Sequence, residues 1–360
     1  MVIAMRGLYI HIPFCLSKCN YCDFNSYAGC LFKAPAYVNA LLKEGEKYKG
    51  EKVDTVYIGG GTPTILNLYD ISRLITGIKD IFSFDENTEF TVEMNPATAK
   101  EEYLKALFSL GVNRISMGGQ SFDDKLLKIL GRTHLTKDIS ESVSLCKKAG
   151  FSNISMDLMF SLPSQTMNSW KDSLEKAVAS GITHISCYGL KIEEGTPFYE
   201  NGVTPLCEEL DREMYHYAVE FLENSGFKQY EISNFALKGK KSKHNLKYWH
   251  CQEYFGLGAG AHGYVGNVRS YNCFPIEKYI EKINLFGDAT QEETPLTKED
   301  MKIEKIIMGL RLKEGIDPGL VSPKKTEELI KAGFMEMEKG NIRFTLKGFD
   351  LSNTILSRLI

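Results

Sequence analysis

The segment "HIPFCLSKCNYCDF", residues 11–24, carries three cysteines in one short stretch. They are Cys15, Cys19 and Cys22, and Phe24 stands where one more cysteine could follow. Thiolates crowded this closely repel one another unless a metal neutralises them. The spacing therefore predicts a metal centre in this loop.

Two kinds of metal centre suit three cysteines. His11, four residues before Cys15, can complete a Cys3His set for zinc. Alternatively, the cysteines can hold three irons of an iron–sulfur cube, and the fourth iron then stays open for a ligand that is not protein. The cysteine spacing alone leaves both alternatives open.

The rest of the composition is that of an ordinary globular chain. Its 360 residues have a formal net charge of −3, which gives no reason to expect nucleic acid or an anionic membrane as partner. We find no run of about 18 apolar residues, and the N-terminal stretch leads directly into the cysteine loop, so we expect a cytoplasmic protein without a cleaved signal. Nine cysteines without such a signal do not resemble a disulfide scaffold. Outside the loop we expect small buried side chains at Cys30, Cys146, Cys187, Cys207, Cys251 and Cys273.

Apolar, β-branched segments alternate with segments of helical period, which predicts a parallel α/β architecture. The expected strands cover residues 8–12, 53–58, 89–94, 114–117, 153–158 and 184–188. Six such units suit a partial (β/α)6 barrel of the TIM type, in which the C-terminal ends of the strands carry the chemistry. At these ends lie the cysteine loop, the glycines of "GGGTP" (59–63), Glu93, Gln120 and Asp157. Glycines allow close approach to a ligand, and the polar side chains can bind one.

These segments together carry a family resemblance, in the right order and along nearly the whole chain. They are "YIHIPFCLSKCNYCDF" (9–24), "GGGTP", "EMNP" (93–96), "GGQSF" (118–122), "LGRTH" (130–134), "DLMFSLPSQT" (157–166) and "HNLKYW" (244–249). The chain resembles the radical S-adenosylmethionine (SAM) family of oxygen-independent coproporphyrinogen III dehydrogenases. The resemblance implies that Cys15, Cys19 and Cys22 bind a [4Fe–4S] cluster with one iron left to SAM. It implies SAM contacts at Tyr9, Tyr21, Gly60, Gly61, Thr62, Glu93, Gln120, Arg132 and Asp157.

Phe24 and "HNLKYW" are similar to the heme chaperone branch of this family. The dehydrogenases have a further cysteine at the position of Phe24, and that cysteine is not a cluster ligand. We therefore expect a protein that binds heme and transfers it to recipient proteins, membrane-associated or respiratory ones among them. His244 is a candidate heme ligand, with His250, His262 or a cysteine as alternatives. The second hypothesis is a coproporphyrinogen III dehydrogenase, an enzyme that oxidatively decarboxylates two propionates, and the third is a structural zinc module. Homodimer formation stays open.

The chain divides into three expected parts. Residues 1–200 form the core, 201–292 an extension with the HNxxYW motif, and 293–360 a small domain. In the last part, residues 298–317 and 322–335 have helical patterns, and 336–349 read as a hairpin with its turn at 339–341. Two helices and a hairpin resemble a winged-helix unit of α+β type. Because acidic residues are interspersed, we expect a lid or docking role and no DNA binding.

Overall fold

In the computed structural model, which describes residues 5–98 and 100–360, a twelve-stranded sheet forms the body of the protein. Six neighbouring strands in it run parallel, each in contact with the next. They are β1 (Arg6–Ile12), β4 (Val53–Gly60), β5 (Glu89–Met94), β6 (Arg114–Gln120), β7 (Ile154–Phe160) and β8 (His184–Gly189). The six strands predicted from the sequence are thus confirmed, β5 with the predicted bounds and the other five with ends that differ by one to three residues.

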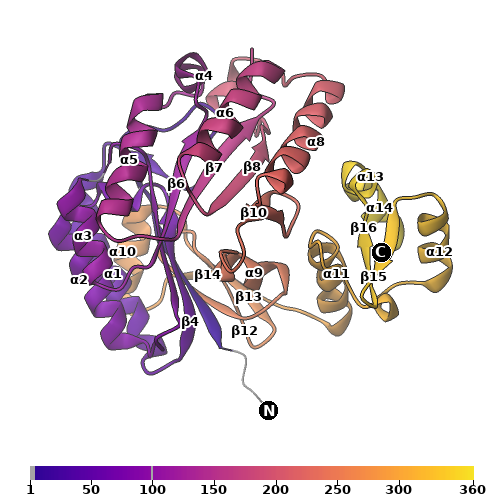
Figure 1. Ribbon diagram of the computed structural model, residues 1–360. Helices are drawn as coiled ribbons and strands as arrows, with labels where there is room; N and C mark the ends of the chain where they lie inside the picture. Colours follow the sequence, from indigo (N-terminus) through magenta and orange to yellow (C-terminus); the bar gives the residue numbers. More distant parts are fainter. Residues whose placement is uncertain (1–4, 99) are drawn as a thin grey trace.

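Helices follow these strands and cover the outer side of the curved sheet (Figure 1). They are α1 (Ala34–Gly45), α2 (Leu68–Ile81), α3 (Glu101–Ser109), α4 (Asp124–Ile129), α5 (Thr136–Lys148), α6 (Met167–Ala179), α7 (Pro197–Glu200) and α8 (Glu208–Asn224). Several begin at the caps that their sequences provide. Asn67 accepts a hydrogen bond from the amide of Asp70 at α2, and Thr166 accepts one from Ser169 at α6.

The sheet continues beyond the six strands on both sides. Its two outermost strands do not pair with each other, so the barrel is open. On one side lie β11 (Tyr254–Leu257), which is parallel to β1, and the antiparallel β12 (His262–Val265), β13 (Val268–Asn272) and β14 (Thr290–Pro295). On the other lie β10 (Asn234–Ala236) and β9 (Lys228–Gln229). Helices α9 (Lys243–Trp249) and α10 (Ile276–Phe286) accompany this extension.

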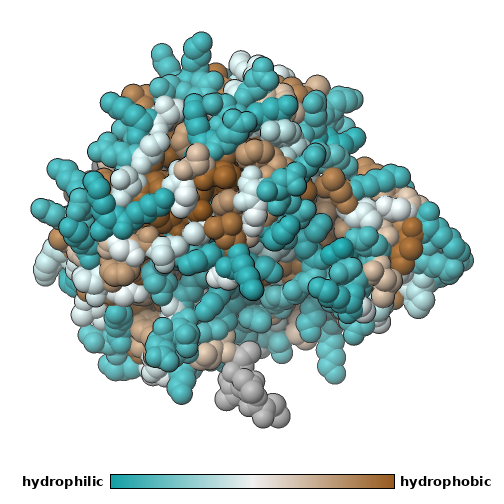
Figure 2. Space-filling view, viewed as in Figure 1, coloured by the Kyte–Doolittle hydropathy of each residue, from teal (hydrophilic) through white to brown (hydrophobic). Residues whose placement is uncertain are grey.

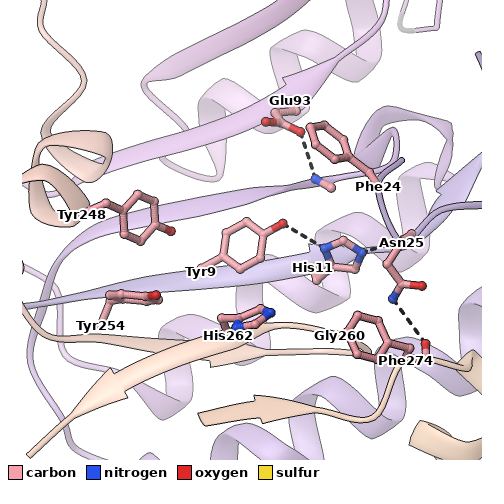
Figure 3. Close-up of a pocket in the computed structure, with 11 residues that line it drawn as sticks. Tyr9, His11, Phe24, Asn25, Glu93, Tyr248, Tyr254, Gly260, His262 and Phe274 are labelled. Atoms are coloured by element: carbon pink, nitrogen blue, oxygen red, sulfur yellow. Dashed lines mark hydrogen bonds between the residues drawn. The ribbon is translucent and has the colours of Figure 1, made fainter. Parts of the chain in front are cut away.

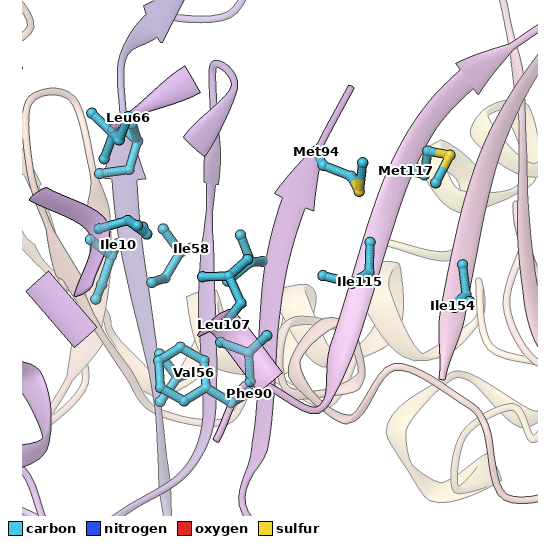
Figure 4. Close-up of a cluster of buried hydrophobic side chains, with 14 of the residues drawn as sticks. Ile10, Val56, Ile58, Leu66, Phe90, Met94, Leu107, Ile115, Met117 and Ile154 are labelled. Carbon is cyan, nitrogen blue, oxygen red and sulfur yellow. The ribbon is translucent and has the colours of Figure 1, made fainter. Parts of the chain in front are cut away.

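The core lies between the parallel strands and the helices. Ile10, Ile58, Ile115 and Met117 are fully buried there, and Figure 4 shows them projecting from strands β1, β4 and β6. Parallel strands covered on both faces require such continuous apolar sequences. Trp170 of α6 is also fully buried and donates a hydrogen bond from Nε1 to the Met214 carbonyl of α8, at 2.8 Å.

The C-terminal unit has a hydrophobic cluster of its own, which includes Ile306, Leu310, Ile342 and Phe344. Its elements are α11 (Lys298–Gly309), α12 (Pro323–Lys331), β15 (Met335–Glu338), β16 (Asn341–Phe344), α13 (Leu346–Asp350) and α14 (Ser352–Leu359). The order of two helices and a hairpin agrees with the prediction. The turn is shorter than predicted, because Asn341 already belongs to β16.

Figure 1 shows this unit, in yellow, beside α8 and β10. Asp350 connects it to α8 by a 2.9 Å contact with His216. Most of the face in view is hydrophilic, with apolar side chains in patches between the charged ones (Figure 2). No helix among the described residues is long and apolar enough to cross a bilayer.

Candidate functional site

The cysteine loop is fixed to the rim of the barrel by Asn20. Its amide donates to the Leu130 carbonyl at 3.0 Å, and its side chain donates to the Ile129 carbonyl at 2.8 Å. On the other side of the loop, the Phe198 amide donates to the Asn20 carbonyl at 2.9 Å. The segment that carries the three cysteines therefore has a defined path over the C-terminal ends of the strands.

One cavity of about 120 Å³ brings most of the predicted site residues together at this rim. We call it the cofactor cavity. The predicted residues that line it are Cys15, Cys19, Tyr21, Cys22, Gly60, Gly61, Thr62, Glu93, Gln120, Arg132 and Asp157. Positions far apart in the sequence thus meet as the parallel barrel requires.

A chain of polar contacts joins two of the cysteines across this cavity. Thr62 Oγ1 lies 3.7 Å from Cys15 Sγ and accepts a hydrogen bond from Asn95 Nδ2 at 2.9 Å. Arg132 donates from Nη2 to Asn95 Oδ1 at 2.6 Å and from Nη1 to Cys19 Sγ at 3.5 Å. Sequence reasoning missed Asn95, although it stands within the "EMNP" segment.

Two partly buried carboxyl groups face the cavity, Glu93 from β5 and Asp157 from β7, with β6 between these strands. Burial raises the pKa of Glu93 to about 7, against the opposing effect of hydrogen bonds from Tyr57 and the Gly60 amide. Burial also raises the pKa of Asp157. A cationic ligand would offset the cost of ionising both groups, so the site favours a ligand with positive charge.

The thiols are suited to an iron–sulfur cluster. Burial raises the pKa of Cys15 and of Cys22, and metal binding would convert both to thiolates. Within residues 5–98 and 100–360, no three His, Cys, Asp or Glu side chains converge as ligands of one metal ion do. In a cube each cysteine binds a different iron, which three thiols spaced around one cavity fit. The buried Ser26 hydroxyl also lines the cavity and lacks a partner in the described chain, so it can meet a bound group.

Two predicted residues lie outside the cofactor cavity. Tyr9 instead lines a neighbouring cavity of about 500 Å³, where its hydroxyl hydrogen-bonds His11 Nδ1 at 2.8 Å (Figure 3). His11, the candidate fourth zinc ligand, uses its other nitrogen in a 2.8 Å contact with the Asn25 carbonyl. Both ring nitrogens of His11 therefore contact groups other than the three cysteine thiols.

The third such residue, His244, lines neither of these two cavities. The predicted helix is present as α9, but the His244 side chain is fully buried. Nδ1 is 2.9 Å from the Thr55 hydroxyl and Nε2 is 2.7 Å from the Tyr248 hydroxyl. Burial lowers the pKa of His244 to about 3. Both ring nitrogens of His244 thus have hydrogen-bond partners, and binding of heme iron by this residue would require one of these contacts to break.

The scattered cysteines divide into three groups. Cys146, Cys187 and Cys273 are buried as expected, and Cys30 and Cys251 are partly buried. Cys207 is exposed, against the expectation, because it stands at the N-cap of α8.

Comparison with known proteins identifies the family. The sequence model of the radical SAM superfamily matches residues 9–177. A Lactococcus lactis protein named heme chaperone HemW is 36% identical, over 99% of this chain and 97% of its own length. A Bacillus subtilis protein of the same name is 37% identical over 99% of each chain. The chain belongs to the HemW family of radical SAM proteins.

Membership in the radical SAM superfamily implies a [4Fe–4S] cluster and SAM as cofactors. The fold agrees with that of a solved radical SAM enzyme, coproporphyrinogen III oxidase (HemN) from Escherichia coli, with a TM-score of 0.86. That likeness covers 98% of this chain and 89% of the other, at 23% sequence identity, and it shows the fold alone.

Proposed function

We propose that this protein is a heme chaperone, which binds heme and transfers it to recipient proteins. The observation that carries the proposal is the likeness, over nearly the full length of both chains, to two proteins named heme chaperone HemW. The cofactor cavity supports it, because the residues expected around the cluster and SAM meet there.

In this proposal Cys15, Cys19 and Cys22 hold three irons, and the fourth iron has no protein ligand. Arg132 binds the carboxylate of SAM, while Glu93 and Asp157 balance the positive charge of its ammonium and sulfonium groups. The remaining predicted residues of the cofactor cavity contact the same ligand. When bound, the cluster supplies the electron for reductive chemistry on SAM, and this chain's side chains orient the ligand and exclude water.

Phe24 supports a chaperone over a dehydrogenase. Its side chain is 63% exposed and lines the cofactor cavity, the neighbouring cavity of about 500 Å³ and a third cavity of about 930 Å³. An apolar ring at this junction can pack against a porphyrin, whereas a thiol would offer redox chemistry. We therefore propose that the protein does not decarboxylate coproporphyrinogen III.

The proposal extends to partners and location. The recipients would be heme-accepting proteins, including membrane-associated or respiratory ones. For the three parts of the chain we propose the bounds predicted from the sequence, 1–200, 201–292 and 293–360. All nine cysteines are free, which suits a reducing compartment such as the cytoplasm. A homodimer and its dependence on the cluster are open to measurement by gel filtration.

An anaerobic hemin titration of the cluster-reconstituted protein, followed by gel filtration, tests the function. We expect saturation near about one hemin per chain and a complex that survives the column. Consumption of coproporphyrinogen III with release of 5′-deoxyadenosine, and only loose hemin binding, would instead establish the dehydrogenase. Zinc in place of iron and sulfide would establish the third hypothesis.

A further inference from the structure

The cavity beside the cofactor cavity is walled by aromatic rings. We call it the aromatic cavity, and Figure 3 shows it. It is lined by Tyr9, His11, Phe24, Asn25, Gly60, Glu93, Tyr248, Tyr254, Gly260, His262 and Phe274. Its volume of about 500 Å³ lies within the usual range for cofactor-sized ligands. Because Phe24, Gly60 and Glu93 also line the cofactor cavity, the two spaces adjoin.

Heme iron needs an axial ligand, and a histidine nitrogen is a common one. All seven histidines of the chain lie in the described residues. Six of them have a ring nitrogen engaged by a hydrogen bond or an acidic partner: His11, His134, His184, His216, His244 and His250. Within residues 5–98 and 100–360, His262 alone has neither kind of contact. Both of its ring nitrogens therefore lack a protein partner in this part of the chain, and it lines the cavity.

The backbone places the His262 ring at the wall of the aromatic cavity. His262 is the first residue of β12, and it is paired with Tyr271 of β13. The two rings stack with centroids 5.3 Å apart, which restricts the orientation of the imidazole. Figure 3 shows His262 in a row with Tyr254 and Phe274, facing Tyr9 and His11 across the cavity.

The chemical state of His262 suits iron. The side chain is exposed on one side, and the partial burial of its ring lowers the pKa below the ordinary value for histidine. The imidazole is therefore neutral near pH 7, the form that binds metals. Arg269, the cation that contributes to this lowering, is held by Glu304 in a two-pronged ion pair and does not occupy the cavity.

We propose that heme binds in the aromatic cavity with His262 as the axial ligand of its iron. The inference rests on the proposed function, and it states where the heme binds and which residue coordinates its iron. Phe24 and Phe274, which are 63% and 46% exposed, cover the porphyrin faces at the mouth of the cavity. No Lys or Arg is among the described residues that line it, so the propionates point to solvent and to the recipient.

The same geometry connects the cargo to the cofactor. Glu93 faces both cavities, and its carboxylate accepts from the Gly60 amide at 2.9 Å. A SAM molecule held by Glu93 would form part of the wall against which the heme packs. We expect heme affinity to differ between protein with and without SAM.

The test compares hemin binding by wild type, His262→Ala and His250→Ala, all cluster-reconstituted. His250 is a matched control because it lies at the surface near Glu314, outside the aromatic cavity. His262→Ala is expected to lose the wild-type heme absorption and electron paramagnetic resonance signature and to bind hemin about tenfold or more weakly. Added imidazole is expected to restore the signature, which a merely structural role of His262 would not explain.

The outcomes separate this inference from the proposed function. If wild type binds hemin saturably and His262→Ala keeps the same spectrum and affinity, the His262 assignment is wrong and the chaperone function stands. If His250→Ala alone loses the signature, the ligand is His250 and the assignment is equally wrong. If wild type shows no saturable binding, the proposed function itself fails.

Discussion

The pKa of Glu93 leads to a sharp expectation about SAM binding. Burial raises this pKa to about 7, so the carboxyl is mostly protonated below about pH 6 and mostly ionised above about pH 8. A ligand with ammonium and sulfonium groups binds the ionised form better. SAM affinity is therefore expected to rise with pH.

The magnitude follows from the ionised fraction. With a pKa of about 7, the fraction rises about tenfold between about pH 6 and about pH 8, which corresponds to about 1.4 kcal/mol of binding free energy. At about pH 7 binding releases about half a proton from this group. Calorimetry in two buffers of different ionisation enthalpy measures both the affinity and the proton count.

Glu93→Gln is the matched variant, because it removes the titrating group and keeps the size of the side chain. The amino group of SAM also titrates in this range, so the signal is the difference between the two proteins. We expect weaker binding and no Glu93-dependent rise in the variant. An equal rise in both proteins, or a fall in affinity with pH in wild type alone, would refute the reasoning.

The raised pKa of Glu93 also makes the stability of the cofactor-free protein depend on pH. The folded pKa of Glu93 lies above the value of 4.5 that an unperturbed glutamate has. Its contribution to stability is thus fully present below about pH 4.5 and is lost as pH rises through about 7. The shift from 4.5 to about 7 sets an upper limit of about 3 kcal/mol on this loss, because the Glu93 side chain keeps some exposure to solvent. Urea unfolding at several pH values should show this slope in wild type and a smaller one in Glu93→Gln.

Three further predictions concern other parts of the chain. Cys19→Ala should lose iron and sulfide by colorimetric assay, whereas Cys146→Ala should keep both; retention in Cys19→Ala would contradict the cluster assignment. Trp170→Ala should lower the free energy of unfolding, measured in urea, by about 3–5 kcal/mol. The substitution leaves a cavity in the core and removes the hydrogen bond to the Met214 carbonyl. A loss below about 1 kcal/mol would contradict this packing. Phe24→Cys should keep full cluster content and gain no turnover of coproporphyrinogen III; such turnover, measured by 5′-deoxyadenosine release, would show that Phe24 decides between the two functions.

The parallel core could be predicted because its signals are local. Strand β5 was predicted with the bounds that the structure has, Glu89–Met94, and each of the other five overlaps its predicted range. The cofactor cavity followed from the rule that chemistry gathers at the C-terminal ends of parallel strands. Asn95 stands two positions after the predicted Glu93, but its contact with Arg132 depends on the fold and has no signal in the sequence.

The extension could not be predicted in the same way. Strand β11 has only four residues, Tyr254–Leu257, and it pairs with β1 across more than two hundred positions of sequence. In the resulting sheet α9 packs against β4, where His244 is buried against Thr55, and His262 stands at a cavity wall. Which histidine is free depends on these long-range contacts, and no periodicity in the sequence records them.

We propose that the protein hands heme directly to a recipient. The most direct measurement mixes the heme-loaded protein with a heme-free acceptor of distinct absorption and follows transfer at increasing acceptor concentration. Direct handover predicts a transfer rate that rises with acceptor concentration, because the recipient meets the exposed propionate edge. A rate that stays constant and equals that of spontaneous heme loss would contradict the account.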